Sequence, residues 1–177
     1  MFLKVYVIAG KARSGKTPAA RILKKLYEER GLKVVISEYS KYVKLFAKEL
    51  LGWDMVSEPK PRDFLQEMGD YVRTLKEDIY FVKRMNEDLS IYEKFVDVVI
   101  ISDARLPQEL DGLENYKPIK IKVANCLPLY DLTEKQASHL TEHALDTYEH
   151  YDYIFSDLSI EKMEEELKNM IEKENEQ

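Results

Sequence analysis

A glycine-bearing loop between an apolar run and an amphipathic run is the feature that most constrains this fold. The segment Gly10–Thr17 reads GKARSGKT and has the spacing G-x-x-x-x-G-K-[ST]. It follows the apolar run 2–9 and precedes the segment 16–30, whose apolar residues recur at helical spacing. The sequence therefore predicts a strand, a glycine-dependent turn and a helix in immediate succession.

Each fixed position of this loop suits the binding of a phosphate. Glycines at positions 10 and 15 allow successive N–H groups to face an anion, and the helix N-terminus adds a favourable dipole. Lys16 can neutralise the outer phosphates, and the Thr17 hydroxyl can ligate magnesium. The alternative is a strand–helix turn that binds nothing. We expect the whole loop to bind ATP with Mg²⁺, through Gly10, Lys11, Ala12, Arg13, Ser14, Gly15, Lys16 and Thr17.

Strand and helix patterns alternate along the rest of the chain. Four further strands are predicted at 32–37, 96–102, 117–123 and 151–156. Helical patterns are found at 40–53, 62–77, 79–94 and 160–175, whereas 53–61 is a predicted loop and 125–150 is irregular. This alternation predicts an α/β fold with a central parallel sheet of about five strands and helices on both faces. Ligands of such sheets bind at the carboxyl ends of the strands.

Two charged residues follow the apolar strand 96–102 at that edge of the sheet. Asp103 could hold the magnesium shell or accept a proton, and Arg105 could bind a phosphate through two hydrogen bonds. The alternative is an exposed ion pair in a loop. The expected catalytic residues are Lys16, Arg13, Asp103 and Arg105, and the expected magnesium ligands are Thr17 and Asp103.

The predicted helix 62–77 carries a third polar group. Spacings of three and four place its members on one helical face. They are Arg62, Gln66, Asp70 and Arg73. They could bind a substrate, or they could form a solvated face with apolar residues packed behind it.

Charge and composition limit the classes of partner and site. The net charge of −6 argues against nonspecific binding to nucleic acid or to an anionic membrane. No apolar run approaches the ~20 residues that span a bilayer, and no signal-peptide pattern is present. Cys126 is the only cysteine, which excludes an internal disulfide. We therefore expect a cytoplasmic protein. The stretch HLTEH at 139–143 has the H-x-x-E-H order of inverted zinc peptidases, a weak signal by itself.

Four stretches occur in the order typical of one kinase group. They are GKARSGKT, RDFLQEMGDYVR, ISDARLPQEL and TEHALDTYEHYDYIFSD. Over about residues 4–160 the chain resembles the deoxynucleoside monophosphate kinases of phages and bacteria. It is also similar to the animal-type phosphomevalonate kinases, which belong to the same P-loop nucleoside monophosphate kinase group. The resemblance implies one P-loop NTPase domain over 1–177, built as a three-layer sandwich.

The resemblance also implies roles for particular segments. Arg13 would lie beside the transferred phosphate, and the polar group of 62–77 would bind the acceptor among helices at about 40–95. A lid-like segment would span about 125–140. A segment that leads into the last strand would have a structural role near the donor base. It contains Glu142, Leu145 and Asp146.

Two departures from this group bear on activity. Thr17 directly follows Lys16, whereas the group's loop often reads Gly-Lys-Asp-Thr. The group usually closes an arginine-bearing lid over the phosphates, but no arginine follows Arg105 and the segment 125–140 offers only Lys135 as a cation. Either Arg13 and Lys135 suffice, or the chain is a slow or altered kinase.

The expected function is therefore Mg²⁺- and ATP-dependent phosphoryl transfer to a small phosphorylated acceptor, foremost a (deoxy)nucleoside monophosphate. Two alternatives stay open: a kinase of a non-nucleotide phosphate such as phosphomevalonate, and a nucleotide-binding regulator without turnover. The apolar stripe of Met163, Leu167 and Ile171 predicts a docking face for the same core or a homodimer contact.

Overall fold

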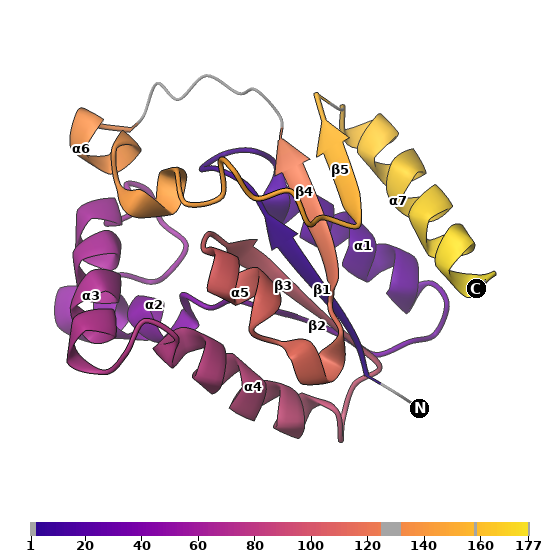
Figure 1. The fold of residues 1–177 in the computed structure, drawn as a ribbon, viewed down its shortest axis with the longest axis horizontal. Coiled ribbons are helices and arrows are strands. Elements are labelled where there is room, and N and C mark those ends of the chain that lie inside the picture. The colour runs from indigo at the N-terminus through magenta and orange to yellow at the C-terminus, as the bar shows by residue number, and fades with distance from the viewer. Residues whose placement is uncertain (1–2, 125–131, 158, 177) are drawn as a thin grey trace.

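The computed structural model describes residues 3–124, 132–157 and 159–176, and its centre is a sheet of five parallel strands (Figure 1). The strands lie in the order β2-β3-β1-β4-β5. They are β1 (Lys4–Ala9), β2 (Val34–Ser37), β3 (Val98–Ala104), β4 (Ile119–Ala124) and β5 (Tyr153–Ser156). The α/β architecture and the parallel sheet expected from the sequence are confirmed.

The first strand lies at the centre because it can bury both of its faces. Its residues alternate between the two cores: Tyr6 and Ile8 belong to one, and Val5 and Val7 to the other. Parallel pairing places Ala9 beside Ala104 of β3 on one side and beside Lys122 of β4 on the other. The segments that follow these three strands therefore begin at the same edge of the sheet.

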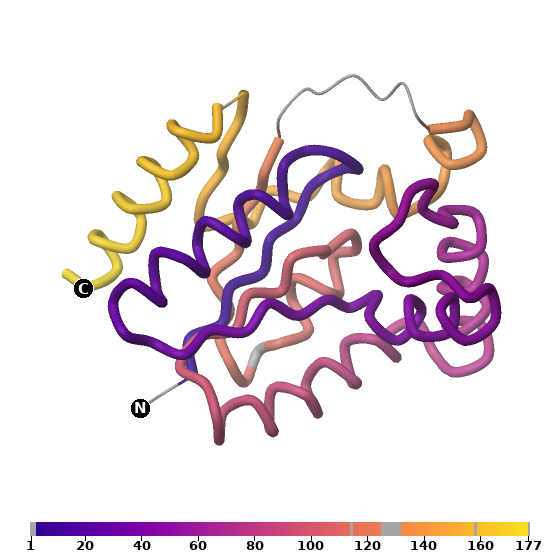
Figure 2. Tube along the Cα trace, turned by 180° about the vertical axis from the view of Figure 1, so that it is seen from behind, coloured from indigo at the N-terminus to yellow at the C-terminus, as the bar shows by residue number. Residues whose placement is uncertain are grey.

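Helices cover both faces and extend beyond one end of the sheet. One face carries α1 (Lys16–Glu28) and α7 (Ile160–Asn175), which lie side by side in Figure 2. The other carries α4 (Tyr80–Tyr92), the short α5 (Pro107–Asp111) and the 3-10 turn η1 (Glu114–Tyr116). The remaining elements gather at the left of Figure 1. They are α2 (Lys41–Leu51), α3 (Arg62–Leu75), α6 (Glu134–Ala137) and the 3-10 turn η2 (Leu140–Glu142).

The terminal helix docks onto the chain's own core. Met163, Leu167 and Ile171 are buried beneath α7, where they join the cluster that includes Leu23 of α1. The apolar stripe therefore serves the first of the two roles expected for it. Within the described ranges, no helix combines the length and the apolar character that crossing a bilayer requires.

The second helix differs from its sequence pattern. Its apolar residues lie broadly on one helical face, but only Val43 and Ala47 are buried, while Leu50 and Leu51 are 65% and 53% exposed. The helix packs beside α3 beyond the sheet, so only a narrow stripe of its surface meets the core. The third strand also runs two residues further than expected, because Ala104 still pairs with Ala9. Asp103 therefore lies within β3 rather than after it.

Candidate active site

The phosphate loop connects β1 to α1 at the shared edge of the sheet. Gly10 and Gly15 have φ angles of +151° and +99°, a region that residues with a side chain rarely adopt. A Cβ atom at Gly10 would lie 2.3 Å from the carbonyl oxygen of Val123 and 2.5 Å from Oγ of Ser14. The glycine at the start of the motif is thus required by both the backbone conformation and the close approach of β4.

The side chain of Lys16, the first residue of α1, folds back onto the phosphate loop. Its side chain is buried, and its ammonium donates hydrogen bonds to the carbonyl oxygens of Gly10 (2.7 Å) and Lys11 (2.6 Å). Burial is the main cause that lowers its pKa to about 7; the positive charge of Arg105 acts in the same direction, and Glu142 opposes it. An anion bound over the loop would restore the charged form.

Arg105 and Glu142 join the phosphate loop to more distant parts of the chain. The guanidinium of Arg105 forms an ion pair with Oε1 of Glu142. The other oxygen of this buried carboxylate accepts the backbone N–H of Ala12, at 2.9 Å. Glu142 therefore connects η2, the residue after β3 and the phosphate loop. Asp146 contacts the loop as well, through an ion pair of 2.7 Å with Lys11.

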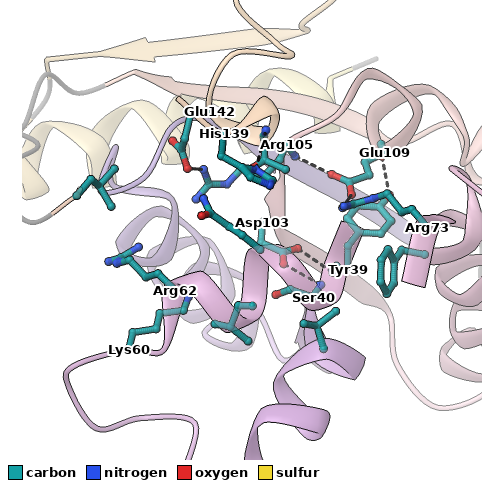
Figure 3. A pocket seen from close by; sticks show the side chains of 17 residues that line it. Tyr39, Ser40, Lys60, Arg62, Arg73, Asp103, Arg105, Glu109, His139 and Glu142 are labelled. Carbon is teal, nitrogen blue, oxygen red and sulfur yellow. Dashed lines mark hydrogen bonds and ion pairs between the residues drawn. The ribbon is translucent and has the colours of Figure 1, made fainter. Parts of the chain in front are cut away.

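Asp103 anchors the connection between β2 and α2. Its two carboxylate oxygens accept the backbone N–H groups of Tyr39 (2.8 Å) and Ser40 (3.0 Å), as Figure 3 shows. Thr17 is exposed in the first turn of α1. Among the described residues, no group of three or more histidine, cysteine, aspartate or glutamate side chains could hold a metal ion. Thr17 and Asp103 stay the protein ligands that the sequence predicts for a magnesium ion.

Glu109 orders the turn after β3. This buried carboxylate accepts the backbone N–H groups of Arg105 (2.7 Å) and Leu106 (3.1 Å). Burial chiefly, and the negative charge of Asp103, raise its pKa to about 7, while Arg73 opposes the shift. The residue fixes the position of Arg105 through the backbone.

A cavity opens between this edge of the sheet and α3 (Figure 3). Five of the residues expected from the sequence line it: Arg62, Gln66, Arg73, Asp103 and Arg105. Asp70 does not line it. Its carboxylate lies 3.1 Å from Nη1 of Arg73 and 2.8 Å from Nε2 of His139. Asp70 therefore contacts two side chains that line the cavity.

The described part of the lid-like segment rests on α3. Residues 125–131 lie outside the described ranges. Lys135 is exposed and forms a 2.6 Å ion pair with Glu67, so the cation expected over the phosphates does not line the cavity. Gln136 donates to Asp63 at 2.7 Å, and this contact also holds α6 against α3. The segment therefore covers the α3 side of the site.

Comparison with known proteins bears on the fold. No protein-family model matches the sequence, and no curated protein is significantly similar to it. Among solved structures, shikimate kinase from Acinetobacter baumannii in complex with shikimate matches with a TM-score of 0.54 at 11% identity, covering 98% of this chain and 95% of that one. A sugar kinase from Janibacter sp. HTCC2649 matches with a TM-score of 0.50 at 14% identity, covering 96% and 95%. The chain has the P-loop kinase fold. The expected three-layer sandwich is therefore confirmed.

The histidines of HLTEH do not form a metal centre in this P-loop kinase fold. His139 contacts Thr141 and Asp70, whereas His143 lies 2.9 Å from the carbonyl oxygen of Ala137. The glutamate between them, Glu142, is bound to Arg105. The resemblance to an inverted zinc-peptidase motif is therefore one of sequence order only.

Two charged residues that line the cavity, Lys60 and Glu109, were not predicted from the sequence. Lys60 lines it from the loop 53–61, where two prolines and no apolar period give nothing that marks the position. Glu109 was recognisable: it is four residues after Arg105, at the start of a short helix with Pro107 in its first turn.

Proposed function

We propose that this protein transfers a phosphoryl group from ATP, with Mg²⁺, to a small acceptor that already carries a phosphate, foremost a (deoxy)nucleoside monophosphate. One observation carries the proposal. The phosphate loop and the cation-lined cavity meet at the Arg105–Glu142 pair, so a donor on the loop would adjoin an acceptor in the cavity.

The donor side supports this proposal through charge and preorganisation. When bound, ATP with magnesium supplies the phosphoryl group, and the transfer requires positioning and charge neutralisation more than a covalent catalyst. Lys16 and the loop N–H groups would bind the donor phosphates. Arg105, held by Glu142 and by the turn that Glu109 orders, would face the transferred group. Arg13 is in the loop with a φ of +59° and is an additional candidate for that group.

The acceptor side supports the proposal through Arg73. Its guanidinium lies 5.2 Å from the centre of the Phe81 ring and is held by Asp70, so its position is fixed before any ligand binds. Among the described residues, no acceptor pairs with its buried Nε atom. Gln66 and Arg62 line the same cavity, about two and three helical turns before Arg73. Cations and an amide at these places suit a phosphorylated acceptor.

Coupled release of ADP tests the proposal. The acceptor panel would hold nucleoside and deoxynucleoside monophosphates and phosphomevalonate, with the unphosphorylated nucleosides, shikimate and a hexose for comparison. Lys16→Ala should abolish turnover. Lys24→Ala, on the outer side of α1 in an ion pair of 3.5 Å with Glu28, should leave it unchanged.

The outcomes separate the alternatives. ADP release that requires a phosphorylated acceptor supports the proposal, and the acceptor that works decides between a nucleotide and a non-nucleotide phosphate. Release with an unphosphorylated acceptor alone would refute it. Binding of ATP with no acceptor-dependent release across the panel would also refute it and would point to a regulator.

A further inference from the structure

Lys60 lies at a wall of the cavity, in the connection just before the helix that begins at Arg62. Its half-buried side chain lines the cavity next to Arg62, and Figure 3 shows both residues on the same side. Its backbone is fixed at two points. The N–H of Lys60 donates to the Glu58 carboxylate at 2.7 Å, and its carbonyl accepts the N–H of Arg62 at 2.7 Å.

The cations of the cavity fall into two groups. Arg105 is paired with Glu142, and Arg73 lies 3.1 Å from the Asp70 carboxylate. Within residues 3–124, 132–157 and 159–176, by contrast, neither the Lys60 ammonium nor the Arg62 guanidinium has an ion-pair or hydrogen-bond partner. The excess positive charge of the cavity is therefore concentrated at this one wall.

Such an arrangement is unfavourable for the protein without a ligand. Burial, followed by the charges of Lys44 and Arg62, lowers the pKa of Lys60, with Glu38 acting in the opposite direction. Two unpaired cations held near each other repel, and each loses hydration without gaining a partner. A bound anion would remove both costs. The wall therefore has the physical character of an anion-binding site.

The charge at this wall also indicates which anion fits. A phosphate monoester carries about −1.5 to −2 charges at pH 7, which suits two cations better than a monocarboxylate or a neutral hydroxyl does. We propose that Lys60 is a specificity-determining residue that, together with Arg62, binds the phosphate which the acceptor already carries. This inference rests on the proposed function in that it takes the cavity as the acceptor site.

Chemical labelling tests the subsite independently of turnover. The intact protein would be treated with N-hydroxysuccinimide acetate, and acetylation of each lysine would be measured by peptide mass spectrometry. Inorganic phosphate should slow the acetylation of Lys60, whereas acetate at equal ionic strength should not. Lys48, exposed in the last turn of α2, serves as the matched control. The same protection should occur in Lys16→Ala, where the phosphate loop has lost its lysine.

Kinetics with the best acceptor of the panel test the consequence for specificity. Lys60→Met should raise the KM for a phosphorylated acceptor by about tenfold or more, as expected for one lost charge-assisted hydrogen bond, and leave the KM for ATP unchanged. Lys60→Arg should restore most of the loss, and Lys48→Met should have no effect.

The outcomes of the two experiments distinguish the subsite from the kinase. Protection of Lys60 by phosphate together with the KM effect supports the inference. Equal protection by acetate, or none by phosphate, overturns it. Turnover with a phosphorylated acceptor that Lys60→Met does not alter would overturn the subsite alone. Silence across the acceptor panel would refute the proposed kinase, and labelling would then still decide whether this wall binds phosphate.

Discussion

Binding of a magnesium–nucleotide should weaken as the pH rises from 7 to 9, because Lys16 loses its charge in the free protein. Burial lowers the pKa of this lysine to about 7, so the ammonium is stable only at the acidic end of that interval. Bound phosphates would stabilise the charged form and raise the pKa again. The contribution of Lys16 to binding is therefore complete only well below pH 7 and is lost progressively as the pH rises through and above 7.

The size of the effect follows from that pKa. With a value of about 7, about half of the free protein carries the charge at pH 7 and about one molecule in a hundred at pH 9. If only the charged form binds, the Kd should rise about fiftyfold over this interval. At pH 8, binding should take up about 0.9 proton per site. The ligand contributes little, since the second pKa of a phosphate monoester is about 6.

Isothermal titration calorimetry with Mg²⁺ and a non-hydrolysable ATP analogue measures both quantities. Titrations at pH 7, 8 and 9 give the Kd, and two buffers with different ionisation enthalpies at pH 8 give the proton uptake. Glu109 also has a pKa raised to about 7, so Glu109→Gln serves as the control, and the pH dependence should persist in it. A Kd constant within twofold from pH 7 to 9, without proton uptake, would show that Lys16 stays charged in the free protein.

Three substitutions test the packing around the site. Gly10→Ala places a Cβ atom 2.3 Å from a backbone oxygen of β4 and should abolish the thermal shift produced by the nucleotide; a normal shift would show that the loop has another conformation. Glu142→Gln removes the ion pair with Arg105 and should lower the free energy of unfolding by about 1–3 kcal/mol in urea denaturation; no loss would mean that the pair is not formed in solution. Leu167→Ala removes a fully buried side chain and should cost about 2–5 kcal/mol in the same assay; an unchanged midpoint would contradict the docking of α7.

Local patterns were sufficient to predict the fold. The apolar run of β1, the glycine turn and the helical period of α1 are each visible within a few residues, and alternation of such units leaves few topologies. The end of β3 was harder to predict from the sequence, because Asp103 belongs to the strand only through the pairing of Ala104 with Ala9. The apolar face of α2 shows a further limit. A period of 3.6 residues identifies a face but not its partner, and Leu50 on this face is 65% exposed in the folded chain.

The location of positive charge at the site could not be predicted in this way. A segment-by-segment count gives the lid only Lys135, and from this count the site looks poor in cations. In the folded chain Lys135 binds Glu67 at the surface, while Lys60 and Arg62 reach the cavity from a different connection. Charge at a parallel-sheet edge is supplied jointly by loops that are remote in sequence. An arginine-free lid therefore does not by itself imply a site that is poor in positive charge, since Lys60 and Arg62 line the cavity from another part of the chain.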